Sequence, residues 1–221
     1  GNGTQSGQTV GHGLGAVPKM IISKDRNASS NVPHWRVYHE SIGNTKYLTL
    51  QGTNAASTFN DWDNTTPTSS VYSVGGAGGY TPTNNNNTPY IAYCFAEKQG
   101  YSKFGKYVGT GNANGPFVYT GFKPAWVMVK NVDNGGYDWA IMDSTRTPTN
   151  ANGTYEFLWA NLNGAEFTDG DSGINMEIDF LSNGFKIRTA RGELNLASTF
   201  IYMAFAENPF VTSTRIPTTA R

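Results

Sequence analysis

Tyr90–Glu97 (YIAYCFAE) decides the fold of this chain, because a close copy follows at Phe200–Glu207 (FIYMAFAE). Both runs are apolar, carry aromatic and β-branched residues and lack Gly and Pro, which favours a β-strand. Each run ends on Glu after the same Phe-Ala pair. A recurrence of this kind is the signature of an internal repeat.

Four blocks of the first half recur in the second half in the same order. The other matched pairs are GLGAVPKMIISK (13–24) with GFKPAWVMVK (121–130), HWRVY (34–38) with DWAIM (138–142), and YL (47–48) with FL (157–158). We therefore expect two homologous copies of one module, residues 1–105 and residues 106–221. Residues 101–108 (YSKFGKYV) predict a strand ahead of the second copy that has no counterpart ahead of the first. From this we expect the natural chain to continue on the N-terminal side.

Short strand-like runs alternate along the chain with Asn-Gly, Asp-Gly and Gly-Gly turn signals. No window shows helical amphipathicity over three turns, and strands at this spacing are typical of sandwiches and jelly rolls. The sequence predicts an all-β protein of two antiparallel, jelly-roll-like β-sandwich repeats. The repeats are expected to lie in tandem or to be fused with pseudo-twofold symmetry.

Composition excludes several classes of protein. The 16 basic and 16 acidic residues balance, so the chain lacks the basic surplus of a nucleic-acid binder. Aromatic residues make up 13%, which excludes a charge-rich disordered chain. No apolar run reaches the roughly 18 residues of a membrane span, so we expect no membrane insertion. The single cysteine, Cys94, cannot form an intrachain disulfide and is expected to be a buried hydrophobe.

The catalytic and metal signals are weak. The three histidines (His12, His34 and His39) lie in the first copy only, without metal-ligand spacing or a nucleophile elbow. Glu97 and Glu207 could form a glycosidase pair, but equivalent glutamates more simply accept backbone hydrogen bonds. We expect no enzyme and no cofactor. Asp169 and Asp171 are a weak Ca²⁺ candidate, because the loop lacks the downstream Glu of an EF-hand.

The sequence does contain residue types suited to binding a sugar. Aromatic rings can stack on sugars, while amides and carboxylates bind their hydroxyls. Trp62 has acidic and amide neighbours and no clear counterpart in the second copy, Trp159 lies beside Asn161, and Tyr80 precedes an Asn-rich loop. The expected ligand-binding residues are Trp62, Asp61, Asp63, Asn64, Trp159, Asn161 and Tyr80. The alternative for Trp62 is a half-buried anchor of its loop.

Several longer motifs resemble those of structural proteins of marine bacteriophages, including cyanophages and their relatives. They are YTGFKPAWVMVK (119–130), YCFAEKQGYSKFG (93–105), DFLSNGFKIR (179–188) and YMAFAE (202–207). In that family the region is typically the C-terminal part of a long virion protein, often a tail fibre. The resemblance spans nearly the whole chain, and it brings no catalytic residues with it.

This resemblance implies a non-enzymatic module on the virion exterior, at the distal end of a tail fibre or spike, that attaches to host-surface glycan. By analogy with other fibres, the expected assembly is a homo-oligomer, a homotrimer, joined to other virion proteins. On this interpretation, Trp62→Ala should weaken adsorption without changing the fold. Two alternatives stay open: a capsid-decorating or appendage-forming module that binds other virion subunits, and, with less support, a glycan depolymerase.

Overall fold

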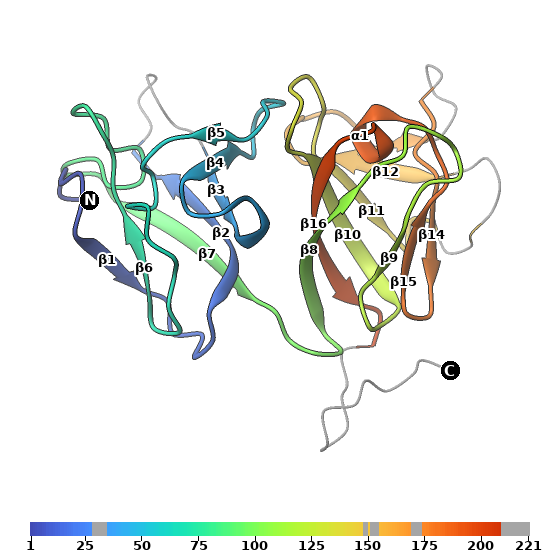
Figure 1. Cartoon of the computed structure of the whole chain (residues 1–221), viewed down its shortest axis with the longest axis horizontal. Helices are drawn as coiled ribbons and strands as arrows, with labels where there is room; N and C mark the ends of the chain where they lie inside the picture. The colour runs from blue at the N-terminus through green and yellow to red at the C-terminus, as the bar shows by residue number, and fades with distance from the viewer. Residues whose placement is uncertain (28–34, 148–149, 151–154, 169–173, 209–221) are drawn as a thin grey trace. The chain divides into compact units, whose positions relative to one another are not determined.

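A computed structural model describes residues 1–27, 35–147, 150, 155–168 and 174–208 of the chain (Figure 1). It confirms the all-β prediction, since antiparallel strands form almost all of the regular structure. The chain divides into two compact units, Gly1–Ala96 (unit 1) and Glu97–Arg221 (unit 2). The helical segments of the described residues are short, Glu40–Ile42 (η1) and Gly192–Asn195 (α1), and neither could cross a membrane.

Unit 1 is built from a five-stranded sheet and a two-stranded sheet. In spatial order, the larger sheet consists of β5 (Ser57–Thr58), β4 (Lys46–Thr49), β3 (Arg36–His39), β2 (Pro18–Asp25) and β7 (Tyr90–Ala96). The smaller sheet pairs β1 (Gln8–Gly11) with β6 (Val71–Val74). The two sheets pack through a core to which β2, β3 and β6 contribute; its buried members are Ile21, Tyr38, Trp62, Tyr72 and Val74.

Unit 2 has a six-stranded and a three-stranded sheet. The larger sheet runs β13 (Phe167–Thr168), β12 (Glu156–Trp159), β11 (Ala140–Asp143), β10 (Pro124–Asn131), β16 (Thr199–Ala206), β8 (Ser102–Val108). The smaller sheet runs β14 (Ile178–Leu181), β15 (Gly184–Ile187), β9 (Phe117–Tyr119). One apolar cluster joins the facing sides of both sheets, as in a sandwich.

The larger sheets of the two units share the same strand pairing, residue for residue. β2 pairs with β7 from Pro18↔Ala96 to Asp25↔Tyr90, and β10 pairs with β16 from Pro124↔Ala206 to Asn131↔Phe200. Each pairing has a register shift directly after its proline. The β3–β4–β5 and β11–β12–β13 registers also correspond. Residues aligned between the two halves of the sequence thus occupy equivalent positions in these two sheets.

One detail differs from the sequence expectation. The division between units falls at Ala96/Glu97, not at 105/106, and β8 crosses residue 105 because it pairs along β16. In the smaller sheets, β6 pairs with β1 as β15 pairs with β9. The counterpart of β6 is therefore β15, and β14 lies one strand further out.

Cys94 lies on β7 and is half-buried against the core of unit 1. Burial raises the pKa of its thiol to about 11. The thiol is therefore protonated at neutral pH and behaves as a small apolar group rather than as a nucleophile.

Candidate functional site

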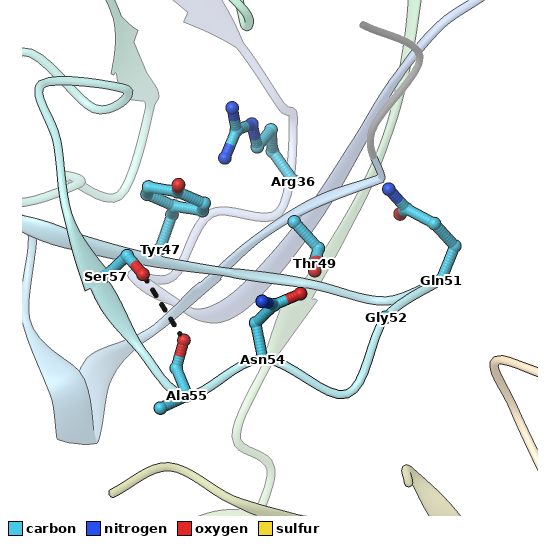
Figure 2. A pocket seen from close by; sticks show the side chains of 8 residues that line it. All are labelled: Arg36, Tyr47, Thr49, Gln51, Gly52, Asn54, Ala55 and Ser57. Carbon is cyan, nitrogen blue, oxygen red and sulfur yellow. Dashed lines mark hydrogen bonds between the residues drawn. The ribbon is translucent and has the colours of Figure 1, made fainter. Parts of the chain in front are cut away.

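A pocket of about 380 Å³ opens in unit 1, where β3, β4 and β5 meet the turn that follows β4 (Figure 2). Its lining is mostly polar and uncharged. The lining residues are Arg36, Tyr47, Thr49, Gln51, Gly52, Asn54, Ala55 and Ser57. In Figure 2 the Asn54–Ala55 segment lies across the pocket from Arg36.

The strand registers bring these side chains to one face of the sheet. Arg36 on β3 pairs with Thr49 on β4, and Tyr47 pairs with Ser57 on β5. Because side chains alternate along a strand, Tyr47 and Thr49 share a face while Leu48 points to the other. Leu48 is accordingly buried at 1% exposure, whereas Tyr47 and Thr49 are half-buried at the pocket.

Arg36 closes one end of the pocket and is itself almost inaccessible. Its side chain is 4% exposed, and its Nε lies 3.5 Å from Oδ2 of the fully buried Asp61. The guanidinium carbon lies 3.9 Å from the centre of the Tyr47 ring, a cation–π contact. Nη2 donates a hydrogen bond of 3.2 Å to the Tyr80 hydroxyl. The Arg36 side chain on β3 thus contacts β4 through Tyr47 and two loops through Asp61 and Tyr80.

This buried pair is incompletely hydrogen-bonded. Nε and Nη1 of Arg36 and both carboxylate oxygens of Asp61 have no hydrogen-bond partner among the described residues. Burial raises the pKa of Asp61 to about 6, although the nearby Arg36 charge opposes the shift. Burial disfavours the Arg36 cation, but the Asp61 charge and the contact with Tyr47 outweigh it, so the pKa of Arg36 is raised. Both groups are therefore charged at neutral pH.

The raised pKa of Asp61 predicts a pH dependence. Its folded-state pKa of about 6 lies above the ordinary value of 3.8, so the folded state binds more protons between these two pH values. Stability contributed by Asp61 is therefore present below pH ~4 and is lost as the pH rises towards about 6. Hydrogen exchange of the β2 and β3 amides between pH 4 and 7 should show this slope. The slope should be missing in Asp61→Asn, and an equal slope in that variant would contradict the assignment.

Unit 2 fills the corresponding space with apolar side chains. The register positions of Arg36, Thr49, Tyr47 and Ser57 are held there by Ala140, Trp159, Phe157 and Phe167, respectively. Their aromatic rings pack at centroid distances of 4.9, 5.5 and 6.2 Å. Unit 1 thus has a polar pocket where the same framework in unit 2 has a packed core.

The structure places Trp62 in the core rather than at a binding surface. It is 1% exposed and packs edge-on against Tyr38 and Tyr72 at 5.8 and 6.5 Å between ring centres. No ring face is left for a sugar, so the expected stacking role is wrong. Asp61 is fully buried beside it. The half-buried Asp63 accepts a hydrogen bond from Gly7 N, and the exposed Asn64 follows it in the left-handed region at φ 46°.

Of the expected ligand-binding residues, the structure brings Asp61 and Tyr80 together, through Arg36. Trp159 is 7% exposed and belongs to the core of unit 2. Asn161 is held by two hydrogen bonds: its Oδ1 accepts from the backbone N of Trp139 at 2.9 Å, and its Nδ2 donates to Oδ1 of the Asp138 side chain at 2.6 Å. The Ca²⁺ candidates Asp169 and Asp171 lie outside the described residues.

The other chemical candidates have structural partners. Glu97 pairs with Lys103 and Glu207 with Lys123, each at 2.8 Å. His39 caps η1 by accepting from Ser41 N, and a ring nitrogen of His12 lies 3.1 Å from Thr68 O. Within the described ranges, no three His, Cys, Asp or Glu side chains gather where they could hold a metal ion.

Sequence reasoning missed Arg36, Tyr47 and Asn54. A signal was present in the repeat itself, because Arg36 and Thr49 stand where the second copy has Ala140 and Trp159. Where one copy has a polar residue and the other an apolar one, the copy with the polar residue lacks core packing at that position. Such a position is a candidate functional site. Asn54 lies in a turn without a matched block, and its exposed side chain lines the pocket.

No curated protein and no solved structure matches this chain. One family model, described as a domain of unknown function, matches residues 1–209 and so runs through both units. The chain therefore belongs to this family, DUF7483.

Proposed function

We propose that this chain is a non-enzymatic binding module on the exterior of a phage virion, in a tail fibre or spike, and that it attaches to host-surface glycan through the pocket of unit 1. The observation that carries the proposal is the exchange of a packed aromatic cluster for polar side chains on the same strand framework. Burying polar groups without full hydrogen bonding costs stability, so such an exchange favours a binding role.

The chemistry of the lining favours an uncharged, hydroxyl-rich ligand. Thr49, Asn54 and Ser57 supply hydroxyl and amide groups, and Tyr47 supplies a ring edge beside them. The one cation in the lining, Arg36, is nearly buried and already faces Asp61. Its role is therefore to hold the side of the pocket in place rather than to bind a charged ligand. Hydrogen bonds to hydroxyls do not depend on ion pairing, which suits a particle in salty water where charges are screened within a few Å.

The lining carries no carboxylate, and hydrolysis of a glycosidic bond needs two facing ones. Glu97 and Glu207 lie in unit 2, each in an ion pair. Binding is therefore favoured over a depolymerase activity. The second candidate, a module that joins other virion subunits, is favoured by one observation: β7 ends its sheet and pairs on one side only among the described residues.

Asn54→Ala tests the pocket. On an array of neutral and acidic oligosaccharides, we expect the wild-type chain to bind at least one class of glycan. Loss of the Asn54 amide should weaken that binding by about tenfold, because a ligand hydrogen bond is lost at the pocket. The matched control is Asn114→Ala, an exposed asparagine in unit 2.

The control should bind like the wild type, and both variants should melt at the wild-type temperature. If Asn54→Ala binds the glycan as tightly as the wild type does, the glycan binds somewhere other than this pocket. An array without any bound glycan would contradict the glycan proposal itself.

A further inference from the structure

The outer edge of β7 carries no neighbouring strand in the described part of the chain. β7 ends the five-stranded sheet of unit 1, where it pairs only with β2. In unit 2 the corresponding strand, β16, is paired on both sides, with β10 and over seven residue pairs with β8. In unit 2 the outer edge of β16 is thus covered by β8, whereas the corresponding edge of β7 in unit 1 is not covered by a strand among the described residues.

Exposure of the two strands differs accordingly. Ile91 and Tyr93 on β7 are 38% and 46% exposed, and Ala92 between them is exposed as well. Their counterparts Ile201, Tyr202 and Met203 on β16 are 2%, 4% and 6% exposed. Apolar residues that are covered in one unit lie in contact with water in the other.

The backbone hydrogen bonds show which groups of β7 point away from β2. In unit 2, Val132 N donates to Thr199 O on the β10 side, and Ala206 N donates to Tyr101 O on the β8 side. In unit 1, Arg26 N donates to Pro89 O in the same way as Val132 does to Thr199. Because these directions alternate along a strand, the N–H and C=O groups of Tyr90, Ala92 and Cys94 point outwards.

Edge strands usually carry features that prevent pairing with strands of other chains, and β7 lacks these features. The features are Lys, Pro, bulges or short length, since a long apolar edge pairs with other chains. β8, itself an edge strand, carries Lys103, Gly105 and Lys106. β7 has seven residues, YIAYCFA, with no charge, no Gly and no Pro.

We propose that the outer edge of β7 takes up an antiparallel strand of the β8 type, supplied by a neighbouring module of the same family. The register of β8 on β16 transfers directly to β7, which places the equivalent of Tyr107 opposite Tyr90 and the equivalent of Phe104 opposite Tyr93. The added strand satisfies the outward backbone groups of β7 and covers Ile91 and Tyr93. Strand addition of this kind draws affinity from the main chain and specificity from alternate side chains.

A pair of methylated peptides tests the proposal on the full chain. The probe is a labelled peptide of residues 101–109 (YSKFGKYVG), and its binding is measured by fluorescence anisotropy. Gly109 N donates to β16 and Tyr101 O accepts from it, so the odd-numbered residues of β8 face their partner strand. N-methylation at Gly105 and Tyr107 should therefore weaken binding by about tenfold or more, because ladder hydrogen bonds are lost. N-methylation at Phe104 and Lys106 should leave binding unchanged.

The matching protein variant is Ala92→Pro, which removes an outward N–H that pairs with no strand among the described residues of unit 1. Proline is tolerated on edge strands when its position faces solvent, so the variant should fold and should lose peptide binding. Equal binding of the two methylated peptides overturns the proposal, whatever the variant does. Unchanged peptide binding by a folded Ala92→Pro chain also overturns it. Sedimentation that shows dimers of the wild type and monomers of Ala92→Pro overturns it too, in favour of a second copy at this edge.

Discussion

Arg36→Met should destabilise unit 1 by about 3–5 kcal/mol, because it leaves the Asp61 carboxylate buried without its cation. Asp61 is 0% exposed, and its carboxylate oxygens have no hydrogen-bond partner among the described residues. Methionine has nearly the length of the arginine stem, so lost packing contributes little. The cost comes from the unpaired charge.

The second variant of the experiment removes both charges. Arg36→Met with Asp61→Leu should recover most of the lost stability, since replacing a buried ion pair by apolar residues is often neutral or stabilising. Protection of the β2 and β3 amides in hydrogen exchange reports on unit 1, and the β10 amides serve as an internal reference in unit 2. A single variant as stable as the wild type would mean that Asp61 is solvated. A double variant no more stable than the single one would mean that packing of Arg36, and not its charge, is what matters.

The strand framework could be predicted from sequence because its signals are local. The run at 90–97 and its copy at 200–207 form β7 and β16, and aligned Pro18 and Pro124 each precede a shift in register. Apolar alternation and turn residues act within a few positions, so one sequence reveals them. The boundary at residue 105 was misplaced because the partner of β8 is β16, which comes far later in the chain.

The candidate site could not be predicted, because it depends on contacts between distant segments. Arg36 in an alternating run suggests a solvent-facing strand position, and only the fold shows Asp61 and Tyr80 beside its guanidinium. Tyr47 lines the pocket and contacts Arg36, whereas Phe157 at the same register position belongs to the core of unit 2. Residue type alone therefore did not separate a pocket wall from a core residue.

Trp62→Ala should destabilise unit 1 by about 3–5 kcal/mol, the usual cost of truncating a buried tryptophan. The sequence interpretation gave this change a different outcome, weaker adsorption with an intact fold. That interpretation took the lack of a counterpart in the second copy as freedom to bind. In the structure the loop before β6 turns through Asp63 and Asn64, both at positive φ, and Trp62 enters the core against Tyr38 and Tyr72.

Two controls separate core packing from binding. Trp62→Phe keeps most of the buried ring, and it also removes an indole N–H that has no hydrogen-bond partner among the described residues, so its cost should stay below about 1.5 kcal/mol. Trp35→Ala removes a half-buried ring stacked on Tyr93 at 6.4 Å and should cost less than Trp62→Ala. Urea unfolding followed by near-ultraviolet circular dichroism gives the three values. If Trp62→Ala unfolds at the wild-type midpoint and loses only glycan binding, the tryptophan belongs to a surface site. If Trp62→Ala loses the most unfolding free energy of the three variants, Trp62 belongs to the core. The loss of stability then follows the apolar area that each side chain buries.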